Sequence, residues 1–73
     1  MGLLTNISGR AAVHAFIRAG WRLEKQVGSH AILANDRRPT KLSVPLSPEL
    51  SQGTLRALIR YSGLSVARFL DYL

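Results

Sequence analysis

The chain has 73 residues, of which 47% are hydrophobic, and it contains no cysteine. A chain this short builds one core, so we expect a single domain over residues 1–73, and the lack of cysteine excludes disulfides and thiolate metal sites. Ten Lys and Arg residues, mostly Arg, oppose four acidic residues and give a formal net charge of +6. This charge favours nucleic acid as a ligand, because a positive field attracts polyanions and guanidinium groups match phosphate. A charge that only maintains solubility is the alternative.

A first helix is predicted between Ser8, a favourable N-cap, and Gly20, which favours a helix end. Apolar residues recur at helical spacing on one face: Ala12, Val13, Phe16 and Ile17. Three residues four apart share a polar and basic face: Arg10, His14 and Arg18. We interpret His14 as a surface residue of this helix.

Three strands are predicted next. Residues 21–25 alternate apolar and charged side chains, which is typical of a half-buried strand. After a break at Gly28, residues 30–34 form a second strand, residues 35–39 a turn and residues 40–44 a third strand, which Pro45 ends. Because the connections are short, we expect an antiparallel sheet.

Two helices are predicted at the C-terminus. The first begins near Ser51 or Thr54 and ends at Gly63, and Ser65 caps a short last helix. Their apolar positions are Leu55, Leu58 and Ile59, then Val66, Phe69, Leu70 and Leu73. The order of helix, three strands, helix and short helix predicts an α+β fold. The sheet buries one face against the helices and leaves the other face for a ligand or partner.

Targeting signals are not recognised in the sequence. The longest apolar runs are too short for a transmembrane helix, and the first six residues lack the charged start and apolar centre of a signal peptide. We therefore expect a cytoplasmic protein that does not bind membranes.

The residue types present exclude most catalytic mechanisms. The sequence offers no cysteine nucleophile, no His-Glu-x-x-His spacing and no phosphate-binding glycine loop. RNA cleavage suits such a set of residues, because RNA carries its own nucleophile, the 2′-hydroxyl group. An imidazole can transfer the protons, and Arg or Lys can stabilise the phosphate. From composition alone, however, His30 is better interpreted as a structural histidine at the start of a strand.

Several short motifs carry a resemblance to a known family. In order they are Ser8-Gly9-Arg10, Ala19-Gly20-Trp21, Gln26-Val27-Gly28-Ser29-His30, Val44-Pro45, Gly53-Thr54-Leu55-Arg56 and Ser62-Gly63-Leu64-Ser65. From about Ser8 to Leu73 the chain resembles the HicA family, which are small messenger-RNA interferase toxins of bacterial and archaeal toxin–antitoxin pairs. Many members continue Val-Pro-x-His after the third strand. This chain has Val44-Pro45-Leu46-Ser47 and lacks that second histidine.

The resemblance implies a fold like the double-stranded-RNA-binding domain. It implies metal-independent cleavage of messenger RNA by the histidine of Gly-Ser-His, here His30, without a cofactor. It also implies neutralisation by a HicB-type antitoxin, which we expect to be acidic and to cover His30 or the basic face. We expect no DNA binding by the chain alone.

The other candidate residues are expected to contact RNA, and they are Gly28, Ser29, Lys25, Lys41, Arg56 and Arg60. Each has a simpler interpretation as well: a turn glycine, a serine that satisfies the turn backbone, or a basic side chain in solvent. Trp21, Phe16 and Phe69 are expected in the core. Two other functions stay open, a noncatalytic RNA-binding module and a protein whose positive surface only docks an acidic partner.

Overall fold

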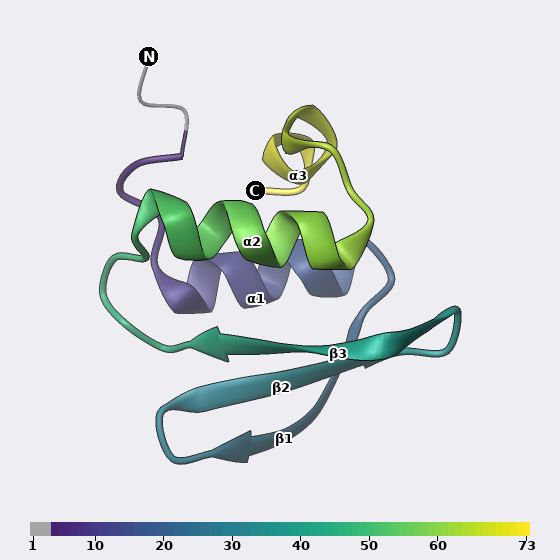
Figure 1. Cartoon of the computed structure of the whole chain (residues 1–73). Coiled ribbons are helices and arrows are strands. Elements are labelled where there is room, and N and C mark those ends of the chain that lie inside the picture. The colour runs from purple at the N-terminus through teal and green to yellow at the C-terminus, as the bar shows by residue number, and fades with distance from the viewer. Residues whose placement is uncertain (1–3) are drawn as a thin grey trace.

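The structure, a computed structural model, describes residues 4–73 (Figure 1). The prediction that the first six residues are not a signal peptide falls partly outside the described residues, because residues 1–3 are not among them. The elements are α1 (Gly9–Arg18), β1 (Arg22–Val27), β2 (His30–Asn35), β3 (Arg38–Pro45), α2 (Gln52–Ser62) and α3 (Val66–Asp71). This order confirms the predicted α+β fold.

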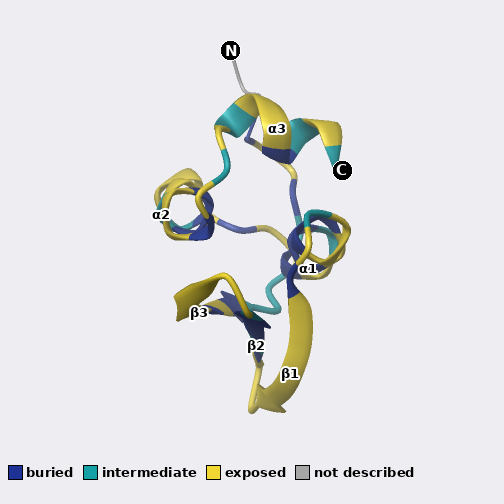
Figure 2. Cartoon of the chain, turned by 90° about the vertical axis from the view of Figure 1, so that its right-hand side faces the viewer, coloured by how far each residue is buried: buried dark blue, intermediate teal, exposed yellow. Residues whose placement is uncertain are grey.

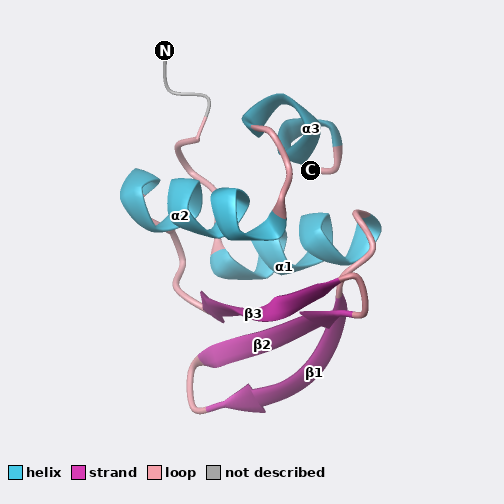
Figure 3. Ribbon diagram, turned by 45° about the vertical axis from the view of Figure 1, so that its right-hand side comes forward, coloured by secondary structure: helices cyan, strands magenta, loops and turns pink. Residues whose placement is uncertain are grey.

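The elements form two main layers. The strands make an antiparallel sheet in the order β1-β2-β3, and α1 and α2 cover one face of it (Figures 1 and 3). The short α3 packs against both of these helices, on the side away from the sheet. In the described part of the chain, no helix has both the length and the apolar character needed to cross a bilayer.

Local sequence signals set the helix ends as predicted. The hydroxyl groups of Ser8, Ser51 and Ser65 each accept a hydrogen bond from the backbone N–H three residues further on. Gly20 and Gly63 follow α1 and α2 with φ angles of 109° and 82°. Glycine adopts this left-handed conformation without steric penalty, so both residues end their helices.

The core lies between the sheet and the helices (Figure 2). Phe16 and Phe69 are fully buried with ring centroids 5.1 Å apart, and Trp21 is buried in the same core cluster. These three core predictions are confirmed. Two other apolar residues were predicted wrongly, because Ile17 and Leu73 are 41% and 49% exposed. Ile17 lies in the last turn of α1 and Leu73 beyond the end of α3, where the pattern of apolar positions no longer marks a buried face.

The first strand departs from its prediction. Only Trp21, just before β1, is buried, and all six residues of β1 are exposed, as the yellow strand in Figure 2 shows. The prediction of a half-buried strand was therefore wrong. A β-bulge between Leu23 and Lys25 breaks the regular alternation. The buried strand residues lie on β2 and β3, so β1 projects as an uncovered edge strand.

The turn between β2 and β3 is shorter than predicted. Only Asp36 and Arg37 form it, and β3 already begins at Arg38. Asn35 Oδ1 accepts a hydrogen bond of 2.9 Å from the backbone N–H of Arg37, which closes the turn. Pro39 lies within β3. A strand accepts proline there because β3 is at the edge of the sheet.

The backbone at the start of α1 lies against the segment that follows β3. The N–H of Gly9 donates to the carbonyl of Ser47 at 2.9 Å, and a Cβ atom on Gly9 would lie 1.9 Å from the carbonyl oxygen of Pro45. The next residue, Leu46, donates its N–H to the carbonyl of Ser29 at 2.7 Å. One short segment thus joins α1 to the turn between β1 and β2.

This close approach predicts that Gly9→Ala is destabilising. The new Cβ would clash with backbone that cannot swing aside, so we expect the free energy of unfolding to fall by about 1–3 kcal/mol or more. Gly53→Ala is the matched control, because a Cβ there meets nothing within 4 Å. In α2 this change should stabilise by about 0.5–1 kcal/mol. Thermal and denaturant unfolding measure both, and equal effects would contradict the steric explanation.

Candidate active site on the open face of the sheet

His30 is the first residue of β2 and follows the two-residue turn formed by Gly28 and Ser29. It pairs with Val27 on one side and with Pro45 on the other. Gly28 has a φ of 57°, and a positive φ at the first turn residue favours glycine. A Cβ on Gly28 would meet nothing within 4 Å. Backbone conformation, and not crowding within the chain, therefore accounts for glycine at this position.

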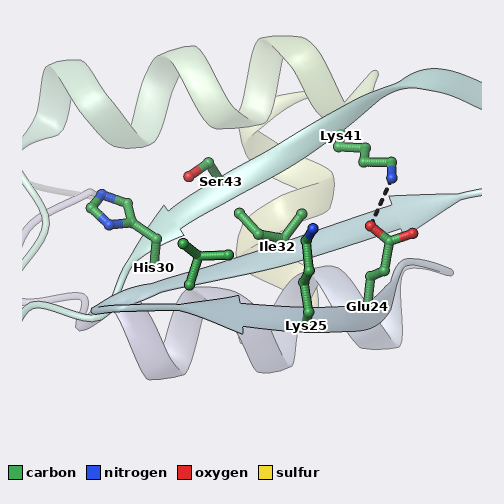
Figure 4. Close-up of a pocket in the computed structure, with 7 residues that line it drawn as sticks. Glu24, Lys25, His30, Ile32, Lys41 and Ser43 are labelled. Carbon is green, nitrogen blue, oxygen red and sulfur yellow. Dashed lines mark hydrogen bonds and ion pairs between the residues drawn. The ribbon is translucent and has the colours of Figure 1, made fainter.

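The sequence left open which face of the sheet carries His30. Along β2, Ala31 and Leu33 are buried against the helices, so His30 and Ile32 lie on the other face. His30 is exposed there and Ile32 is partly buried. We call this uncovered side the open face. A shallow hollow on it is lined by Glu24, Lys25, Val27, His30, Ile32, Lys41 and Ser43 (Figure 4).

The predicted site residues divide into two groups. Lys25 and Lys41 lie on the open face with His30, and Gly28 and Ser29 form the turn directly before it. Arg56 and Arg60 are exposed on α2, in the layer on the opposite side of the sheet. The fold therefore brings the sheet lysines to His30 and leaves these two arginines on another surface.

An ion pair that the sequence analysis missed lies at one end of the hollow. Lys41 Nζ donates to Glu24 Oε1 at 2.7 Å, as the dashed line in Figure 4 shows. This hydrogen bond, with the positive charges of Lys41, Lys25 and Arg22, lowers the pKa of the Glu24 carboxyl. The carboxylate consequently stays ionised at neutral pH, and Lys41 is already engaged when a ligand arrives.

The β-bulge explains why Glu24 was missed. In a regular strand Glu24 and Lys25 would point to opposite faces. Leu23 pairs with Leu33, and Lys25 pairs with Ile32, so two residue steps along β1 lie opposite a single step along β2. Glu24 therefore shares the open face with Lys25. Alternation along β2 and β3 would have identified Ile32 and Ser43, but nothing in the sequence marks the bulge.

These groups together suit chemistry on a phosphodiester. His30 offers an exposed imidazole for proton transfer, Lys25 an ammonium group, and Ser43 a hydroxyl group, around a floor that includes Ile32. Among residues 4–73, no three His, Asp or Glu side chains lie together in a way that could hold a metal ion.

Comparison with known families gives a match over most of the chain. A family model described as the HicA toxin of bacterial toxin–antitoxin matches residues 9–64. The match begins at the first residue of α1 and ends just after α2, so it includes the whole sheet and every residue of the hollow. A search of curated proteins finds no match.

The ion pair generates a prediction about polyanion binding. Glu24→Gln removes a negative charge from the hollow and releases Lys41, so we expect tighter binding of a single-stranded RNA oligonucleotide, by up to about fivefold. Asp36→Asn is the matched control, because it makes the same change in formal charge. Asp36, in the β2–β3 turn, forms an ion pair of 2.8 Å with Arg22 of β1. Fluorescence anisotropy at low salt measures both variants. Equal gains would mean that net charge, and not Lys41, is responsible.

Proposed function

Because this chain belongs to the HicA toxin family of bacterial toxin–antitoxin pairs, we propose that it is an endoribonuclease that cleaves messenger RNA on the open face, with His30 as its proton-transfer group. The observation that carries the proposal is the exposed imidazole of the Gly-Ser-His motif on the face that the helices leave uncovered. The lysines beside it supply the positive charge that a phosphate requires.

The proposed reaction uses the nucleophile that RNA carries. His30 accepts the proton of a 2′-hydroxyl group, whose oxygen attacks the adjacent phosphorus and forms a new P–O bond. The bond to the 5′-oxygen breaks, and this oxygen takes a proton from solvent or from the imidazolium. The products are a 2′,3′-cyclic phosphate and a 5′-hydroxyl group. Lys25 stabilises the negative charge on the phosphate, and Lys41 joins it when its pair with Glu24 opens.

Membership of a toxin–antitoxin family implies an antitoxin partner. We propose that this partner is a net-acidic, HicB-type protein, that the pair acts in the cytoplasm, and that the partner hinders access of RNA to His30. A partner that binds only the folded toxin also stabilises it by mass action, which matters for a domain with a small core.

The first test of this proposal is His30→Ala. Loss of the imidazole should lower the rate of RNA cleavage by at least about 100-fold and relieve growth arrest, while the exposed position of His30 leaves unfolding unchanged. His14→Ala is the control, because His14 is the other histidine and is exposed on α1. Cleavage by His30→Ala at the wild-type rate would exclude His30 from the chemistry. RNA binding without cleavage by the wild type would instead indicate a noncatalytic RNA-binding module.

The second test concerns the products. If the 2′-hydroxyl group is the nucleophile, cleavage should continue in excess EDTA and yield 2′,3′-cyclic phosphate ends, and a DNA oligonucleotide of the same sequence should remain intact. Mass spectrometry of the fragments identifies their ends. Products with 5′-phosphate ends, or activity that EDTA abolishes and magnesium restores, would contradict this mechanism.

A further inference from the structure

The outer edge of β1 has the properties of a binding surface. Because the strand order is β1-β2-β3, β1 pairs with β2 alone in the described sheet, and its other edge presents backbone N–H and C=O groups to solvent. All six residues of the strand are exposed. An exposed edge can accept an extended segment of another chain as a further strand.

A groove runs beside this edge, between β1 and α1 on the helix side of the sheet. Its floor is apolar and includes Val13, Leu46 and Leu23, of which Leu23 is 52% exposed. Arg10 and His14 of α1 also line it, and none of the described residues that line it is acidic. An exposed leucine beside basic side chains suits a peptide that combines an apolar residue with carboxylates.

Charge argues against a second copy of this chain as the occupant. Two copies joined at β1 would bring together two strands of net positive charge, each with Arg22 and Lys25 against Glu24, within molecules that each carry +6. An acidic segment would instead place its carboxylates beside the basic side chains of β1. RNA is also poorly suited, since phosphates gain nothing from the floor around Leu23 and cannot complete a strand ladder.

We propose that β1 and this groove bind an extended acidic segment of the antitoxin, which adds to the sheet as a fourth strand and places an apolar side chain against Leu23. The proposal rests on the proposed function, in which an antitoxin controls the site. Alternate side chains of an added strand point to opposite faces of the sheet. One set therefore enters the groove, and the other lies beside Lys25 and Val27 at the margin of the open face, where carboxylates obstruct RNA.

The test uses Leu23→Glu with Leu73→Glu as its matched control. The two leucines are 52% and 49% exposed, and the substitutions change the formal charge equally. The probe is the purified product of the gene adjacent to that of this toxin, which we expect to encode the antitoxin. Its affinity is measured by isothermal titration calorimetry. We expect Leu23→Glu to weaken binding by roughly tenfold or more and Leu73→Glu to leave it unchanged, with both variants cleaving RNA at the wild-type rate.

Hydrogen exchange supplies the second readout. On binding of the antitoxin, the outward amides of β1 should become protected in the wild type. Equal affinities for the two variants, or a β1 that stays unprotected, would overturn the proposal. If Leu23→Glu instead impairs RNA cleavage alone, the groove serves RNA. Absence of cleavage by the wild type would refute the proposed function and leave the affinity comparison valid. Should Leu23→Glu fail to fold, Arg10→Gln replaces it, because this change in the groove also lowers the formal charge by one and keeps Leu73→Glu as a matched control.

Discussion

The contact of Gly9 with the backbone of Pro45 and Leu46 is the constraint on which the site depends. The N-terminus of α1 approaches the end of β3 so closely that no side chain fits between them. Hydrogen bonds extend this contact from Gly9 to Ser47 and from Leu46 to Ser29, the residue before His30. The helical layer is thereby joined to the turn that directly precedes the histidine. The backbone next to His30 is thus held in place although the side chain itself is exposed.

The elements could be predicted from the sequence because their signals are local. Serine caps, glycine helix ends and a glycine in the β1–β2 turn each act through the backbone within a few residues. The predictions were wrong where contacts between distant parts of the chain determine whether a residue is buried or paired. The exposure of β1 depends on how far α1 and α2 extend over the sheet, and Pro39 is accepted in β3 because no further strand pairs with it.

The site was only partly predictable for the same reason. His30, Lys25 and Lys41 were selected by residue type and by family resemblance, and the fold brings them to one face. The β-bulge at Glu24 then adds a carboxylate that no alternation pattern predicts. Arg56 was chosen for its charge and for its place in the Gly-Thr-Leu-Arg motif, and neither indicates on which layer a residue lies. In a chain of net charge +6, basic residues are common. The position of a basic side chain on the fold is therefore better evidence of a role than its occurrence in the sequence.

The uncovered β1 also bears on how long the free protein persists. A strand that buries no side chain detaches at lower free energy than any part of the core, so local opening begins there. Proteases cleave opened segments in proportion to their population. A cut in β1 would free the strand that carries Lys25 and the turn before His30 from one of their two attachments to the chain, so the same strand that flanks the site would set the lifetime of an unpartnered molecule.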